Sequence, residues 1–295
     1  MHEKIEILPV SLLHQHRGVV DELKGLAENL GLEFGWHYLL DLTWIISQMR
    51  LDKDVRIMDA GAGVGVMQWY LAQKGVEVVS VDRLDRSHLP LRFRLRFQVQ
   101  GMRKGDLAPV LRSNRYREGQ ERSLVQRVAI NAKDILKTGL PGRAPGRVVI
   151  YNQDLQRLAD IRDDSLDYIV AVSALEHNPP ENLNRVVVEL MRVLKPGGRL
   201  LVTLGAARDQ DWFHEPSKGW CYTEATLRDV FDLSSRAPSN YDRYDELFAA
   251  LQNCAELRED LAAFYARSGE NGMPWGLWDP QYQPVGVCKV KPERQ

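Results

Sequence analysis

The first 50 residues carry a pattern that is typical of amphipathic helices. Apolar residues recur every three or four positions from about residue 18 to residue 50, with a break at Gly31 and Gly35. The second half of this stretch, HYLLDLTWIISQM, has a nearly continuous apolar stripe behind Trp36, His37 and Tyr38. We therefore predict an N-terminal helical cap over residues 1–50.

From residue 51 onward, short apolar runs alternate with helical segments. VRIMDA ends at a glycine-rich turn, and an amphipathic segment and a second apolar run, VEVVSVD, follow it. Further runs are RVVIYN (147–152), LDYIVAVS (166–173) and RLLVTLG (199–205), with a helix over 181–194 before the last of them. Continuous apolar runs are typical of a parallel sheet covered on both faces. The pattern predicts a doubly wound α/β domain over residues 51–295.

The C-terminal part predicts a helix from about Thr223, a short strand around 230–235, a helical stretch over 242–266 and a last strand over 285–291. Two insertions interrupt the alternation, at about 84–146 and 236–283. The first contains LRFRLRFQVQ (91–100), in which apolar and cationic residues alternate strictly. Period two predicts a strand with one apolar face and one cationic face that carries Arg92, Arg94 and Arg96.

Composition and charge narrow the class of protein. The chain has 295 residues, 44% of them hydrophobic and 27% charged, as in ordinary globular proteins. Its formal net charge is −1, yet the segment from Arg83 to Arg147 holds 16 Lys and Arg against 5 Asp and Glu, a net of +11. A basic segment in an acidic body favours an anionic partner.

Several classes of protein are disfavoured by what the sequence lacks. The three cysteines are widely spaced, so neither a disulfide framework nor a zinc site is predicted. There is no signal-peptide core and no run of about 18 apolar residues that could span a bilayer. We expect a cytoplasmic protein that needs no metal.

The glycine-rich turn after the first strand predicts a ligand site. Glycines let the backbone approach a ligand, and the following helix presents free N–H groups to it. The spacing is GxGxG rather than the GxGxxG of dinucleotide-binding proteins, and Asp59 before the turn suits a cationic amino group. Asp82, at the end of the second strand, could hold a ribose or simply cap the strand. Asp154 could hold an adenine amino group or cap a helix.

Five motifs in this order resemble the class I S-adenosylmethionine-dependent methyltransferases. They are IMDAGAGVG, VVSVD, NQDL, LDYIVAVSALEH and LMRVLKPGGRLLV. The resemblance implies a Rossmann-like sheet of seven strands with the last strand antiparallel, S-adenosylmethionine as cofactor, and a lid made by the N-terminal helices. It also implies cofactor contacts that the sequence matches at Asp59, Gly61, Gly63, Asp82, Arg83, Asp154, Leu155 and Ser173. The two insertions depart from the family pattern and leave the acceptor open.

Two histidines are candidates for acceptor chemistry. Methyl transfer to a hydroxyl requires alignment of the nucleophile and removal of its proton, and a histidine can accept a proton near neutral pH. His177 follows the fourth strand of the alternation and His214 follows the fifth. Alternatively, His177 shapes a loop and packs on the cofactor, and His214 belongs to a solvated loop.

The basic insertion leaves several partners open. It could be a solvated surface, or it could bind an anionic acceptor, a nucleic acid or a membrane surface. Nucleic acid is less favoured because the cationic face lacks stacking aromatics and no Asn/Asp-Pro-Pro-Tyr/Phe motif is present. We expect O-methylation of a polar or anionic glycan or small metabolite. The alternatives are an RNA methyltransferase and a non-catalytic cofactor-binding protein.

Overall fold

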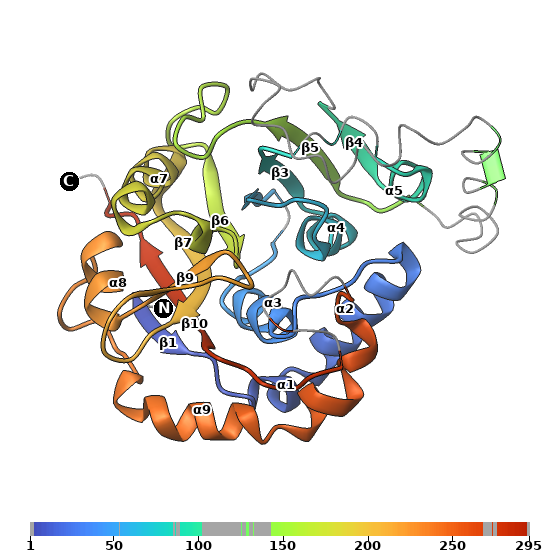
Figure 1. Cartoon of the computed structure of the whole chain (residues 1–295). Coiled ribbons are helices and arrows are strands. Elements are labelled where there is room, and N and C mark those ends of the chain that lie inside the picture. The colour runs from blue at the N-terminus through green and yellow to red at the C-terminus, as the bar shows by residue number, and fades with distance from the viewer. Residues whose placement is uncertain are drawn as a thin grey trace.

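A central sheet organises the molecule (Figure 1). The computed structural model describes residues 3–52, 54–84, 86, 89–101, 125, 128, 129, 132, 143–267, 273 and 276–293. The strand order is β1-β10-β7-β6-β2-β3-β5-β4, and β9 and β8 attach beside β7. The strands are β1 (Lys4–Ile7), β2 (Arg56–Ala60), β3 (Glu77–Asp82), β4 (Gln98–Gln100), β5 (Arg147–Asn152), β6 (Leu166–Val172), β7 (Leu194–Ala206), β8 (Trp212–His214), β9 (Gly219–Tyr222) and β10 (Gln283–Val290).

The strand directions confirm the predicted fold class. The path β7-β6-β2-β3-β5-β4 is parallel throughout, and β10 is antiparallel to β7. The described residues contribute ten strands to the sheet, whereas seven were expected. Among the additional strands, β1 pairs antiparallel with β10, and β8 pairs antiparallel with β9. The division into a cap and a methyltransferase domain stays a prediction, although the N-terminal strand belongs to the same sheet as the rest.

Helices cover both faces of the sheet and enclose two apolar cores. The helices are α1 (Leu12–Gln15), α2 (Arg17–Leu30), α3 (Tyr38–Ser47), α4 (Val66–Gln73), α5 (Leu91–Arg96), α7 (Pro180–Val193), α8 (Glu224–Val230) and α9 (Tyr244–Gln252). One core joins α2, α3 and α4 to the sheet, and the other joins α7 and α8 to its opposite face. The helices predicted over 18–50, over 181–194 and from about Thr223 are confirmed.

The strand predicted over 91–100 is wrong for most of its length. Residues 91–96 form α5, and only 98–100 are extended, as β4. Phe93 and Phe97 explain the difference, because their rings lie 4.8 and 4.9 Å from the ring of Trp69. In a strand these two side chains would stand about 13 Å apart, whereas a helix brings them to about 6 Å. Only the helix lets both rings contact one tryptophan.

Two smaller expectations also change. No strand forms at 230–235, because α8 ends at Val230 and a turn with positive φ at Asp232 follows. The helical stretch over 242–266 is broken into α9 and short turns of 3-10 or π type. Most of the basic insertion lies outside the described residues, and so does part of the second insertion.

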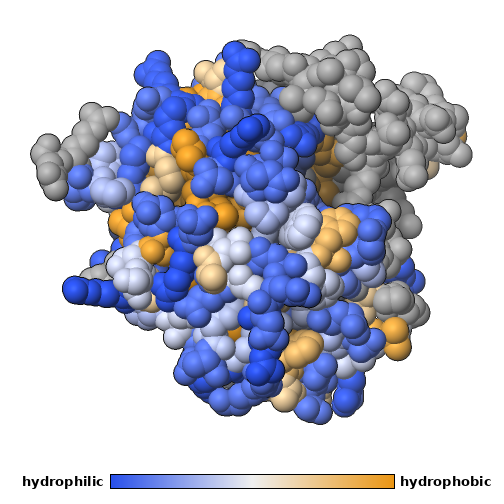
Figure 2. Space-filling model, turned by 60° about the vertical axis from the view of Figure 1, so that its left-hand side comes forward, coloured by the Kyte–Doolittle hydropathy of each residue, from blue (hydrophilic) through white to orange (hydrophobic). Residues whose placement is uncertain are grey.

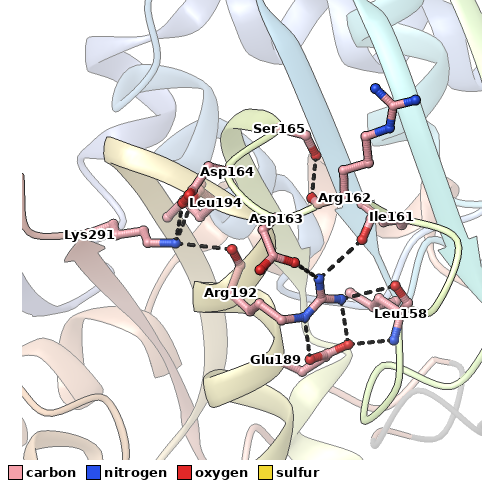
Figure 3. Close-up of polar contacts among 10 residues, drawn as sticks. All are labelled: Leu158, Ile161, Arg162, Asp163, Asp164, Ser165, Glu189, Arg192, Leu194 and Lys291. Atoms are coloured by element: carbon pink, nitrogen blue, oxygen red, sulfur yellow. Dashed lines mark hydrogen bonds and ion pairs between the residues drawn. The ribbon is translucent and has the colours of Figure 1, made fainter. Parts of the chain in front are cut away.

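Polar contacts hold the loop that leads into the amino end of β6 (Figure 3). Arg192 of α7 donates to Glu189 at 2.7 Å and to the carbonyl oxygen of Leu158 at 3.0 Å. Lys291, just past β10, donates to the carbonyl oxygen of Leu194 at 2.7 Å and to Asp164 Oδ1 at 2.7 Å. These contacts tie the loop to α7 and to the end of β10.

The surface is that of a hydrophilic protein on the face drawn in Figure 2, where apolar residues gather only in small patches. Within the described ranges, no helix has both the length and the apolar character needed to cross a membrane.

Candidate functional site

A cavity of about 780 Å³ opens at the carboxyl ends of β2, β3, β5 and β6. This edge is where open α/β sheets bind ligands. The segment between α2 and α3 forms another wall through Phe34 and Tyr38. The residues that the sequence singled out and that line the cavity are Asp59, Gly61, Gly63, Asp82, Arg83, Arg92, Asp154, Leu155, Ser173 and His177. The structure therefore brings the predicted residues together, and their individual roles stay predictions.

The glycine turn between β2 and α4 needs its glycines. Gly61 and Gly63 have φ of 75° and 47°, a region that side chains with a Cβ rarely adopt. A Cβ on Gly61 would lie 2.4 Å from the Cβ of Ala174, so the turn also requires close packing against the end of β6. The backbone of the turn can thus approach a ligand more closely than an ordinary loop could.

Asp82 holds this turn from the neighbouring strand. Its Oδ2 accepts a hydrogen bond from the backbone N–H of Gly63 at 2.7 Å, and its Oδ1 accepts from that of Leu84 at 2.6 Å. Beside it, Arg83 forms an ion pair with Asp154. Asp154 Oδ1 also accepts from the backbone N–H of Gln156 at 2.9 Å, as expected for an acid that caps a turn. Asp82 and Asp154 therefore stabilise the local backbone and also line the cavity.

Asp59 is a buried carboxyl group at the floor of the cavity. Only 2% of its surface is exposed, and its Oδ2 has no hydrogen-bond partner among the described residues. Burial raises the pKa of Asp59 to about 7; the positive charge of Arg86 opposes this and the negative charge of Asp82 adds to it. A buried acceptor without a partner is costly, and a cationic ligand group would relieve that cost.

A buried polar chain lies behind the cavity wall. Ser173 donates to Asp41 Oδ2 at 3.0 Å, and His37 Nδ1 donates to the same oxygen at 2.8 Å. His37 Nε2 lies 3.0 Å from the hydroxyl of Tyr282. Burial lowers the pKa of His37, but the charge and the hydrogen bond of Asp41 together with the charge of Glu176 outweigh burial, so that the pKa is raised. These hydrogen bonds connect α3 to the end of β6.

The sequence reasoning missed Asp41 and Tyr282 and treated His37 only as part of a lid. One signal was available, because His37 and Asp41 are four residues apart in an otherwise apolar helix. Two polar residues one helical turn apart lie on the same face of the helix, so their side chains can hydrogen-bond to each other. Tyr282, 245 positions away from His37, gave no such local signal.

Comparison with known proteins gives one family match. Residues 123–202 match the family model described as "Methyltransferase domain". Within the described residues, this range contains β5, β6, α7 and most of β7. The segments that follow β5 and β6 line one side of the cavity, while β2, the glycine turn and the end of β3 line the other. This match supports a relationship to the class I S-adenosylmethionine-dependent methyltransferases, whose ordered motifs the sequence resembles.

The individual proteins to which the chain is similar are distant. A stretch of 77 residues is 35% identical to ribosomal RNA small subunit methyltransferase A of Treponema denticola, and it covers 24% of this chain and 26% of that protein. Among solved structures, phosphoethanolamine N-methyltransferase 2 of Haemonchus contortus is similar with a TM-score of 0.47 and 14% identity, covering 96% of this chain and 60% of that one. A putative sarcosine dimethylglycine methyltransferase of Galdieria sulphuraria has a TM-score of 0.45 and 18% identity over 87% and 86% of the two chains.

The two candidate histidines have different surroundings. His177 is exposed and lines the cavity, and its Nδ1 lies 2.9 Å from the carbonyl oxygen of Lys218. His214 is buried away from the lining residues, bonded to Ser217 and packed on the ring of Tyr282 at 5.1 Å. Burial lowers the pKa of His214, and the charge of His37 adds to this effect. Of the two, only His177 lines the cavity.

The predicted row of three arginines on one face is wrong, because α5 is a helix. Arg92 lines the main cavity and donates through Nε to the carbonyl oxygen of Leu30 at 2.5 Å. Arg96 borders a smaller cavity between α2 and α4, and Arg94 is exposed to solvent. Of the three, Arg92 alone keeps a place at the site.

Proposed function

We propose that this methyltransferase binds S-adenosylmethionine in the main cavity and methylates an oxygen atom of a polar or anionic glycan or small metabolite, in the cytoplasm. The observation that supports this most is the gathering of Asp59, Gly61, Gly63, Asp82 and Asp154 around one cavity at the carboxyl edge of the sheet. A volume of about 780 Å³ is in the upper part of the range of small-molecule sites, which leaves room for an acceptor beside the cofactor.

The residues present fit the cofactor. The unpartnered Oδ2 of Asp59 suits its cationic amino group, and the turn at Gly61 and Gly63 leaves room for its methionine portion. In this proposal Asp82 and Arg83 hold the ribose side, Asp154 and Leu155 flank the adenine, and Ser173 closes the site. When bound, the cofactor would supply a methyl group on a sulfonium, whose carbon an acceptor oxygen can attack in line while the neutral thioether, S-adenosylhomocysteine, leaves.

His177 is the proposed general base. The carbonyl oxygen of Lys218 can only accept a hydrogen bond, so Nδ1 of His177 carries the proton of the neutral ring. Nε2 then has the lone pair that can take a proton from an acceptor hydroxyl. Because His177 is exposed, the proton can pass on to water. Arg92 is proposed to attract an anionic group of the acceptor.

Calorimetry with S-adenosylhomocysteine tests the cofactor site. The wild-type chain is expected to bind it, and Asp82→Ala is expected to lower the affinity by about 5- to 150-fold, the equivalent of about 1 to 3 kcal/mol for bonds to a charged acceptor. Part of this loss comes from the bond between Asp82 and the N–H of Gly63. Asp209→Ala is the control, since that acid is 87% exposed and lies outside the cavity lining. Equal affinity of the wild-type and Asp82→Ala proteins would contradict the assignment.

RNA methylation is the second candidate. The match to the ribosomal RNA methyltransferase and the net charge of +11 between Arg83 and Arg147 favour it. A screen with methyl-labelled cofactor should therefore include phosphorylated sugars, glycans and ribosomal RNA. Label in RNA and in no small acceptor would replace the first proposal by the second. Tight cofactor binding without label in any acceptor would favour a non-catalytic cofactor-binding protein.

A further inference from the structure

Arg86 is a charged residue that the protein buries completely, with 1% of its surface exposed. Its Nη2 donates to the carbonyl oxygen of Ser80 at 3.0 Å and to that of Tyr151 at 2.9 Å, which joins β3 to β5. Its Nη1 bonds to the hydroxyl of Ser80 and reaches the carbonyl oxygen of Gly63 at 3.4 Å. One guanidinium therefore contacts two strands and the glycine turn.

Gln68 extends this contact over the whole turn. Its Oε1 accepts from the hydroxyl of Ser80 at 2.7 Å. Its Nε2 lies 3.2 to 3.3 Å from the carbonyl oxygens of Ala62, Gly63 and Gly65. Arg86, Ser80 and Gln68 form one buried hydrogen-bond network beneath the residues that face the cavity. Such networks hold a loop in a single conformation when their members are satisfied.

The same guanidinium acts on Asp59 through its charge. Besides burial, the groups that shift the pKa of Asp59 are the cation of Arg86, the carboxylate of Asp82 and the backbone N–H of Gln68. Burial alone would keep Asp59 protonated, and Arg86 is the one of these groups that carries positive charge. The ionised form of Asp59 is the form that can bind a cation.

We propose that Arg86 is a positioning residue that holds the glycine turn and favours the ionised form of Asp59, so that the cavity selects a cationic amino-acid ligand. This inference rests on the proposed function. It implies that binding of S-adenosylmethionine strengthens as the pH rises through about 7, because the pKa of Asp59 is raised to about 7 in the free protein. Binding of adenosine, which lacks the amino-acid portion, has no such dependence.

The test compares the affinity for S-adenosylmethionine with that for adenosine by calorimetry between pH 5.5 and 8.5. Their ratio in the wild-type protein is expected to rise with a midpoint near pH 7. Arg86→Gln keeps hydrogen-bond donors but removes the charge, and we expect its midpoint to move up by at least one unit. A one-unit move lowers the ionised fraction of Asp59 at pH 7 about five-fold. Arg86→Lys keeps the charge, so its midpoint should stay while both affinities fall at every pH.

Asp59→Asn is the matched control and should lose the rise near pH 7, because only the titration of the ligand's own amino group then remains. The same pH profile in folded Arg86→Gln as in the wild-type protein would overturn the role of Arg86. A flat ratio in the wild-type protein overturns it too, and this measurement does not depend on whether any variant folds. Failure of the wild-type protein to bind S-adenosylmethionine at any pH would instead overturn the proposed function, and this inference with it.

Discussion

At the scale of single residues, Asp59 shows a conflict between stability and ligand binding. The sequence predicted a functional acid there because Asp59 ends a buried strand just before a glycine turn. What the sequence did not reveal is how completely the protein buries this group, since burial depends on α4 and on Arg86 packing around it. An acid that must ionise in such a place lowers the free energy of unfolding.

Replacing Asp59 by Asn should stabilise the free protein increasingly as the pH rises. The pKa of Asp59 is about 7 in the folded state against 3.8 in the unfolded state. Folding therefore favours the protonated form, and this contribution is present below pH 3.8 and lost as the pH rises through 7. The wild-type protein should lose up to about 4 kcal/mol relative to Asp59→Asn between pH 4 and pH 8. Urea unfolding at several pH values measures the difference, and a constant difference would contradict it.

At the scale of elements, the apolar runs of the parallel strands were predictable and the segment at 91–100 was not. A strand buried on both faces has a distinctive composition, so β2, β3, β5, β6 and β7 could be found from sequence alone. The alternation at 91–100 was equally regular, but it also placed Phe93 and Phe97 four residues apart. Periodicity could not show that both would pack on Trp69 of α4, and this distant contact decides in favour of the helix.

Phe93→Ala should therefore loosen α5 from α4. Phe93 is buried and its ring lies 4.8 Å from that of Trp69, so its loss should lower the free energy of unfolding by about 3 kcal/mol. Leu95→Ala is the control on the same helix, because Leu95 is 36% exposed and should cost less than about 1 kcal/mol. Denaturant unfolding measures both, and equal losses would argue that α5 does not depend on the aromatic contact.

At the scale of the whole molecule, Trp44 connects the N-terminal helices to the edge of the sheet. Its ring lies against β10 at Gly286, and its Nε1 donates to Glu6 of β1 at 2.9 Å. The sequence placed Trp44 only in the apolar stripe of the predicted N-terminal cap. It could not predict this arrangement, because the pairing of β1 with β10 joins positions about 280 residues apart.

Gly286→Val tests this packing. A Cβ at position 286 would lie 2.6 Å from the ring of Trp44, so the ring or the strand must move. We expect a loss of about 1 to 3 kcal/mol in the free energy of unfolding. Gly18→Ala in α2 is the opposite control, since nothing lies within 4 Å of its added Cβ and alanine favours a helix, with a gain of about 0.4 to 1 kcal/mol. Calorimetric melting of the two variants should show shifts of opposite sign.

The pairing of the first strand with the last also means that the two ends of the described chain are neighbours in space. Lys4 lies opposite Cys288, and Glu3 forms an ion pair with Lys289 at 3.0 Å. A short linker could therefore join the ends, and new ends could be opened at the exposed residues 208–210 between β7 and β8. Such a circular permutant would keep every contact of the cavity, but the motifs would follow one another in a different order along its sequence. The order of the motifs, which identifies the family in the sequence, is thus a matter of where the chain is cut and not something the cavity itself requires.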